Sequence, residues 1–214
     1  MEYSRRNFMK AAGVGAVAVT TTMGTVGAVA AGAVAAGAAP AAKPSPLAIP
    51  VAITKETGSF NINGKVYQAE YEARTTLWEV IAVKLGMTGT NRSCNRASCG
   101  ACSVLLDGTP FYSCHTLAFE AAGKKIFTVE GLGDEKNLHP LQKVANLYAA
   151  AECGFCTPGW EVTAKGLLDK NPNPTADQVK AGLAGHICRC AAYASIIRTV
   201  VDTGKVLRGE AEIA

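Results

Sequence analysis

The sequence has few aromatic residues, a modest net charge and no run of lysines or arginines. Aromatic side chains make up 7% of the 214 residues, and the formal net charge is +4. Nucleic-acid binding normally needs a basic groove and aromatic rings that stack on bases, so we expect no nucleic-acid partner. Histidine is also scarce, and we interpret His115, His139 and His186 as structural or surface residues.

Leucine is absent between Gly13 and Gly37, a stretch rich in alanine and valine that holds six glycines. Arg5 and Arg6 precede this weakly apolar stretch, which is typical of a twin-arginine export signal. We therefore predict a leader over residues 1–42, a proline-containing linker over 43–50 and a periplasmic protein. The alternative is a retained membrane anchor, because the stretch is long enough to span a bilayer.

What the chain does have is eight cysteines in two groups of four. The first group is Cys94, Cys99, Cys102 and Cys114, and the second group is Cys153, Cys156, Cys188 and Cys190. Four thiolates bind one [2Fe–2S] cluster, and the spacing of the first group is that of plant-type ferredoxins. The pattern predicts two [2Fe–2S] clusters and an electron-transfer role. Structural zinc and disulfides remain as alternatives, since both also use paired cysteines.

Local signals predict an α+β domain over residues 51–132 and a helical domain over 133–208. Asn63-Gly64 and Asp107-Gly108 have the sequence of tight hairpin turns. The predicted strands are 51–54, 59–62, 65–71, two strands within 103–112, and 125–130, with one helix over 77–85. The predicted helices of the second domain are 140–150, 158–170, 176–184 and 191–201.

Three helix starts have recognisable caps. Thr76 with Glu79, and Thr175 with Gln178, have the spacing of capping boxes. Thr157 is predicted to be the N-cap of the helix that begins at Pro158.

Each cysteine group has a local environment that suits an anionic cluster. Only small residues separate Cys99 from Cys102, so the backbone can fold closely over iron, and a side chain at Gly100 would interfere. The second group lies just before two predicted helices, whose N-termini favour negative charge. Its Cys-x-x-Cys pair would also suit a thioredoxin-like redox site, although that reading requires a βαβ context.

Several motifs together resemble the iron–sulfur subunit of the molybdenum hydroxylases, the xanthine dehydrogenase and aldehyde oxidoreductase family. The matching segments are residues 99–104, 128–132, 138–142, 153–159, 171–175 and 187–190. The resemblance implies an N-terminal β-grasp plant-type ferredoxin domain followed by an all-α four-helix-bundle domain that holds the second cluster.

The resemblance also implies the direction of electron flow. The second cluster is the one nearer a molybdopterin cofactor in a separate large subunit, and the first cluster passes electrons to an FAD subunit or a cytochrome acceptor. The chain itself then has no catalytic residue. By analogy we expect aldehyde or N-heterocycle oxidation in the partner, and the alternative is a free-standing exported two-cluster carrier.

Gly100, Gly154 and Glu152 are the residues expected to contact cofactors. The family usually has glutamine where this chain has Glu152, and this residue reaches the pterin. Other departures are Ser93 and Ala97, where glycine is common, and His186, where asparagine is common. These differences affect the expected loop geometry and cluster potentials, but not the identity of the ligands.

Overall fold

The computed structural model describes residues 54–134 and 136–213. By its contacts, Val51–Ala214 is one compact unit. The leader, the linker and all but the last residue of the strand predicted over 51–54 lie outside the described residues, and Thr54 is not in a strand. Within the described part, no helix is long and apolar enough to cross a bilayer.

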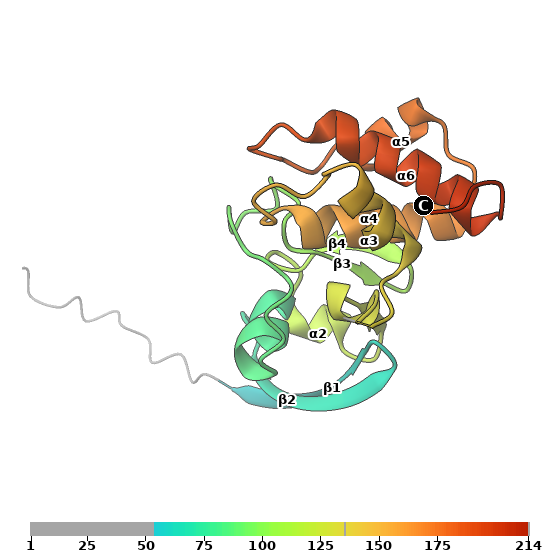
Figure 1. The fold of residues 1–214 in the computed structure, drawn as a ribbon. Coiled ribbons are helices and arrows are strands. Elements are labelled where there is room, and N and C mark those ends of the chain that lie inside the picture. The colour runs from blue at the N-terminus through green and yellow to red at the C-terminus, as the bar shows by residue number, and fades with distance from the viewer. Residues whose placement is uncertain (1–53, 135, 214) are drawn as a thin grey trace, which may run out of the picture. The chain divides into compact units, whose positions relative to one another are not determined.

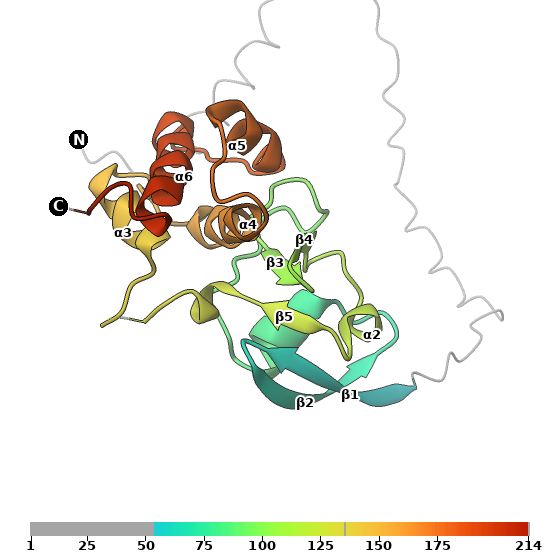
Figure 2. The same ribbon diagram turned by 90° about the vertical axis from the view of Figure 1, so that its right-hand side faces the viewer.

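Five strands form one mixed sheet (Figure 2). They are β1 (Lys55–Ile62), β2 (Lys65–Glu72), β3 (Ser103–Leu106), β4 (Thr109–Tyr112) and β5 (Lys125–Phe127). Their order is β2-β1-β5-β3-β4. Only the pairing of β1 with β5 is parallel. The sheet therefore joins an N-terminal hairpin to a second hairpin through β5.

Both predicted hairpin turns are confirmed. Asn63 and Gly64 have φ values of 51° and 81°, and Asp107 and Gly108 have φ values of 49° and 76°. Two successive left-handed residues are what a two-residue hairpin loop requires, because their twist matches that of the strands.

The helix predicted after β2 forms, but in a wider geometry than expected. It contains the π-helix η2 (Glu79–Lys84), in which the Leu85 N–H donates to the Val80 carbonyl five residues earlier at 3.0 Å. The predicted capping box is confirmed: the Thr76 N–H donates to the Glu79 carboxylate at 2.8 Å, and the Glu79 N–H donates to the Thr76 hydroxyl at 3.3 Å. The cap fixes where the helix starts, and the apolar face then packs on the sheet.

The core between η2 and the sheet follows from the period of the strands. In β1, Gly58, Phe60 and Ile62 are buried and alternate with more exposed residues, as expected of a strand with one face on the core. Every residue of β3 is buried, because its other face is covered by a helix of the second half. The main residues of this core are Phe60, Ile62, Leu77, Val80, Ile81, Val104, Leu106 and Ile126.

The second half of the described chain is helical (Figure 1). Its helices are α3 (Pro140–Leu147), α4 (Thr157–Lys170), α5 (Ala176–Gly182) and α6 (Tyr193–Leu207). All four were predicted, but α3 and α5 end earlier than expected, and α6 begins later and runs six residues further. The short α2 (Ala118–Ala121) was not predicted. The capping box of Thr175 and Gln178 at the start of α5 is confirmed.

The strand predicted over 125–130 is wrong in its second half. β5 ends at Phe127, and residues Val129–Gly131 form the 3₁₀ helix η3. The reason is a long-range contact: the Thr128 N–H donates to the Asn63 side chain at 3.0 Å, and the Asn63 amide donates to the Thr128 hydroxyl at 2.9 Å. These bonds to the first hairpin turn the chain away from the sheet.

Helix α4 connects the two halves. One side of it packs with α3, α5 and α6 around Trp160, Ala164 and Leu168. Another side lies on β3 and β4 (Figure 2). A Cβ on Gly166 would come within 2.8 Å of Leu105, so the absence of a side chain there permits the close approach of α4 to the sheet.

Candidate metal centres

The structure brings together the four cysteines of the first group. Cys94 and Cys99 come from the loop before β3, Cys102 directly precedes β3, and Cys114 follows β4. Cys94 interacts with Cys99, and Cys102 interacts with Cys114. Cys114 alone could have been an ordinary buried residue, but it lies beside Cys102, and the two are 4% and 2% exposed. The group thus consists of two neighbouring pairs.

The loop around Cys94 points backbone N–H groups at its sulfur. The Ser98 N–H donates to Cys94 Sγ at 3.4 Å. Hydrogen bonds from the backbone of Ser98 and then of Arg96 lower the pKa of the Cys94 thiol to about 7, because they stabilise the thiolate. Asn95 and Ala97 take left-handed φ values of 54° and 55° in this loop. Ala97, one of the noted departures from glycine, therefore adopts the conformation that glycine favours.

Gly100 has the two properties that require a glycine. Its φ is 74°, and a Cβ there would collide with the His186 ring and come within 2.6 Å of the Gly185 carbonyl oxygen. The loop of the first group is therefore pressed against the segment that leads into Cys188.

The second group also forms two pairs, at the starts of two helices. Cys153 interacts with Cys190, and Cys156 interacts with Cys188. Cys156 is the N-cap of α4, and Cys190 lies just before Ala192, the N-cap of α6. The predicted placement of the cysteines at two helix N-termini is confirmed, and the dipoles of both helices favour anionic ligands there.

Thr157 is not the N-cap that the sequence suggested. It is the first residue of α4, and its buried hydroxyl has no hydrogen-bond partner among the described residues. Trp160 lies one turn further along, and its buried indole nitrogen also has no hydrogen-bond partner among the described residues. Two orphaned polar groups thus lie within one turn of Cys156, as expected where a polar group is to be bound.

Each group has one more accessible thiol whose pKa is lowered and one less accessible thiol whose pKa is raised. In the second group, the backbone N–H of Phe155 lowers the pKa of Cys153, whereas burial raises the pKa of Cys156 to about 12. In the first group, burial raises the pKa of Cys102 to about 12. Metal binding would have to displace protons from the buried thiols, as it does in other thiolate sites.

The two groups are joined by direct contacts. The Ile187 N–H, adjacent to Cys188, donates to the Cys99 carbonyl at 3.0 Å. A Cβ on Gly159 would come within 3.0 Å of Ala101, between the first-group ligands. The Asn91 amide also donates to the Phe155 carbonyl at 2.9 Å. The sequence did not predict this connection, although the glycines at 100 and 159 were a signal for close packing.

The histidines have structural positions. His139 is the N-cap of α3 and accepts from the Leu141 N–H at 3.2 Å, and His115 is exposed. His186 Nε2 lies 2.9 Å from the Thr163 hydroxyl, and burial lowers the pKa of its imidazole to about 4. His186 is therefore neutral at neutral pH and acts as a packing residue between the two groups.

The donor set at both candidate sites consists of cysteine thiols. All eight cysteines are free thiols in this structure. Across residues 54–134 and 136–213, no three histidine, cysteine or acidic side chains are placed to hold a single metal ion. Two pairs of thiolates with nearby N–H donors suit a [2Fe–2S] cluster, in which each iron takes two cysteines. The residues present therefore fit such a cluster in each group.

Comparisons with known proteins agree with this chemistry. A family model described as a [2Fe-2S] binding domain matches residues 128–201. A model of the TAT (twin-arginine translocation) pathway signal sequence matches residues 2–22. The predicted leader and the predicted iron–sulfur character of the helical region are both supported.

Relatives match a longer part of the chain than either family model. Aldehyde oxidoreductase of Megalodesulfovibrio gigas is 41% identical over 152 residues, which is 70% of this chain and 17% of that protein. The aldehyde oxidoreductase iron-sulfur-binding subunit PaoA of Escherichia coli K12 is 35% identical over 76% of this chain and 75% of its own length. The crystal structure of quinoline 2-oxidoreductase from Pseudomonas putida 86 has a TM-score of 0.68 and 39% identity, covering 73% of this chain and 99% of that one.

These matches define the class of protein. The chain belongs to the family of iron–sulfur subunits of aldehyde oxidoreductases and xanthine dehydrogenases. It is thus an iron–sulfur subunit of a multi-subunit oxidoreductase, and it spans 17% of the length of the M. gigas relative.

Proposed function

We propose that the chain carries two [2Fe–2S] clusters, one in each cysteine group, and conducts electrons out of a molybdopterin-containing partner. Cys94, Cys99, Cys102 and Cys114 hold the first cluster, and Cys153, Cys156, Cys188 and Cys190 hold the second. In this proposal, residues 51–132 form a β-grasp ferredoxin domain and residues 133–208 a four-helix domain. When bound, the clusters supply one-electron transfer.

The observation that carries the proposal is the contact between the groups. The N–H of Ile187, the neighbour of the proposed ligand Cys188, donates to the carbonyl of Cys99, a proposed ligand of the first cluster. A path made of covalent bonds and one hydrogen bond favours electron transfer between the two clusters. A structural zinc protein has no need of such a connection.

The direction of flow rests on exposure and on the relatives. Cys153 is exposed, and so is Phe155 beside it, at 47%. This end of the molecule is therefore accessible to the large molybdopterin subunit that the proposal requires. The name of one relative, an aldehyde oxidoreductase iron-sulfur-binding subunit, is that of one subunit among several. The first group then delivers electrons to an FAD subunit or a cytochrome. The twin-arginine signal supports a periplasmic location for the complex.

Glu152 is the residue that we expect to reach the pterin. It is exposed beside Cys153, so it can face a partner. An ionised carboxylate accepts hydrogen bonds but cannot donate one, unlike the glutamine common in the family. Glu152→Gln in the assembled complex should therefore alter the molybdenum EPR signal, whereas Glu56→Gln, in the exposed part of β1, should leave it unchanged.

The decisive experiment is purification of the complex from its native host. We expect about four iron atoms and about four sulfide ions per copy of this chain, two per cluster, with two EPR signals on reduction. A molybdenum-containing large subunit should co-purify. Absence of iron and acid-labile sulfide would falsify the proposal, and recovery of the iron-loaded chain alone would favour a free-standing carrier.

A further inference from the structure

The two tryptophans of the chain differ in how their indole N–H groups are satisfied. Trp78 Nε1 donates to the Thr90 carbonyl at 2.8 Å. Trp160 is completely buried, and its Nε1 has no partner among the described residues. Buried N–H groups are nearly always hydrogen-bonded, because an unpaired one loses its bond to water without replacement. The orphaned donor of Trp160 therefore points to a missing acceptor.

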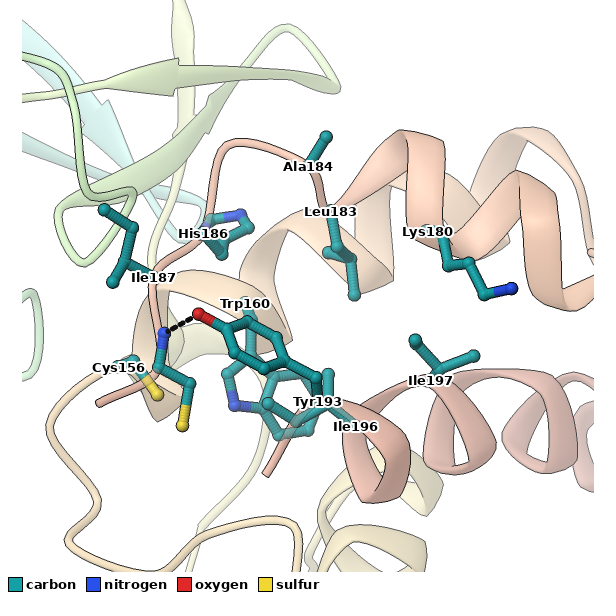
Figure 3. A pocket seen from close by; sticks show the side chains of 11 residues that line it. Cys156, Trp160, Lys180, Leu183, Ala184, His186, Ile187, Tyr193, Ile196 and Ile197 are labelled. Atoms are coloured by element: carbon teal, nitrogen blue, oxygen red, sulfur yellow. Dashed lines mark hydrogen bonds between the residues drawn. The ribbon is translucent and has the colours of Figure 1, made fainter. Parts of the chain in front are cut away.

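The position of Trp160 on α4 places it beside the second cysteine group. It lies four residues after Cys156, so both side chains are on the same face of the helix. Trp160 and Cys188 belong to one buried cluster, against which Cys156 and Cys190 pack. In Figure 3 the nitrogen-bearing edge of the ring lies toward the sulfur atom of Cys156.

The surroundings leave few other acceptors. Trp160, Cys156 and Cys188 line one cavity of about 230 Å³ whose walls are mainly aliphatic. The Tyr193 hydroxyl already accepts from the Cys188 N–H at 2.9 Å (Figure 3). Lys180 is a cation bound to Asp177 at 2.8 Å. His186 Nδ1 also has no partner among the described residues, but it faces Gly100, where an added Cβ would collide with it. The sulfur atoms at the second group are therefore the candidate acceptors for the Trp160 N–H.

We propose that the indole N–H of Trp160 donates a hydrogen bond to a sulfur atom of the cluster held by the second group, and so raises its reduction potential. The inference rests on the proposed function, because it requires the cluster. Reduction adds negative charge to the sulfurs, and a donor in a buried, apolar setting stabilises that charge more than it does in water. Trp160 is then a tuning residue and not a ligand.

The test is Trp160→Phe in the full chain within its complex. Phenylalanine keeps most of the apolar volume and removes the donor. In an EPR-monitored redox titration, we expect one of the two signals to shift to a more negative midpoint. The expected size is about tenfold in the reduction equilibrium constant, or about 59 mV for one electron. The other signal should stay in place.

Trp78→Phe is the matched control, because it removes an indole whose N–H is already bound to Thr90. It should leave the signal of the second cluster unshifted. Two intact signals with no shift in Trp160→Phe would overturn the inference while leaving the proposed function standing. Absence of the signals from the unmutated complex would instead mark failure of the proposed function.

A second measurement covers the case in which Trp160→Phe does not assemble. The Trp78→Phe protein, labelled with ¹⁵N at its remaining indole, is reduced and measured by pulsed EPR. A hydrogen bond from Trp160 predicts a ¹⁵N hyperfine coupling on one cluster. A labelled protein with both EPR signals and no such coupling would overturn the inference.

Discussion

The two cysteine groups present similar sets of sulfurs by different backbone means. The first group relies on an irregular loop with left-handed residues at Asn95, Ala97 and Gly100, supported by the ends of two strands. The second group relies on the starts of α4 and α6. In both groups, backbone N–H groups lower the pKa of one thiol, while burial raises the pKa of a second, less accessible thiol. The chemistry of the ligands therefore does not dictate one local fold, and the requirement common to both is N–H groups directed at sulfur.

Because different backbone elements hold the two cysteine groups, we expect the groups to tolerate substitutions differently. The loop of the first group is enclosed by His186 and Gly185, whereas Gly154 in the second group has nothing within 4 Å of its Cβ position. The first group is thus held by tertiary packing, and the second by helices with an open outer side. Four predictions test this comparison, from the largest expected effect to the smallest.

The largest effect should follow from removing one ligand of either group. Cys102→Ser and Cys153→Ser should each abolish one EPR signal and about half of the bound iron, because we propose that each group holds its own cluster. Cys102→Ser should also lower the thermal unfolding temperature more, since Cys102 is 2% exposed and Cys153 is exposed. Iron analysis, EPR and thermal unfolding measure these effects. Loss of both signals from either variant would contradict independent sites.

Replacing either of two glycines with left-handed φ values by alanine separates the cost of backbone strain from the cost of overpacking. Gly100 and Gly154 have φ values of 74° and 78°, but only Gly100 is enclosed. Gly154→Ala should cost about 1–2 kcal/mol from the backbone conformation alone. Gly100→Ala should cost about 2–4 kcal/mol, because overpacking against His186 and Gly185 is added. Thermal unfolding of the two iron-loaded variants measures the difference, and equal losses would show that the enclosure of Gly100 is unimportant.

A pH-dependent effect is expected from α4, the helix that both regions share. Glu161 is 5% exposed, and burial raises the pKa of its carboxyl to about 7 from its usual value of 4.5. The folded state therefore holds this proton more tightly than the unfolded state. The free energy of unfolding therefore falls as the pH rises from about 4.5 to about 7, by about 3 kcal/mol in all.

Glu161→Gln removes that cost. The variant should be more stable than the unmutated protein at pH 8, and the gain should vanish at about pH 3.5 and below, where the carboxyl is protonated in both states. Thermal unfolding at the two pH values measures it. Glu56→Gln, an exposed site, is the control and should show no such pH dependence. A gain of equal size at both pH values would mean that the substitution acts through packing.

The smallest effect compares the two capping boxes, one in each region. The Thr76 and Thr175 hydroxyls each accept from a backbone N–H at 3.3 Å. Thr76→Ala and Thr175→Ala should each cost about 1 kcal/mol. The loss at Thr76 should be slightly larger, because its hydroxyl also donates to Glu79 at 3.0 Å. Thermal unfolding distinguishes them, and no loss in either variant would contradict a capping role.

The local features were the ones that the sequence predicted well. The Asn63-Gly64 and Asp107-Gly108 turns and the two capping boxes depend on residues within four positions of each other. Features that depend on distant residues were missed or placed wrongly. The predicted strand stops at Phe127 because Thr128 bonds to Asn63, which is 65 residues away in the chain.

The sequence by itself determined which thiols are available and how each segment turns, because ligand spacing, hairpin residues and helix caps act over a few residues. Only the tertiary structure decided how the thiols pair, how Ile187 meets Cys99, and that the Trp160 indole finds no partner within residues 54–134 and 136–213. These outcomes depend on how α4 packs on β3 and against the other helices. Such packing is the sum of many weak contacts between residues far apart in the chain, and no short motif encodes it.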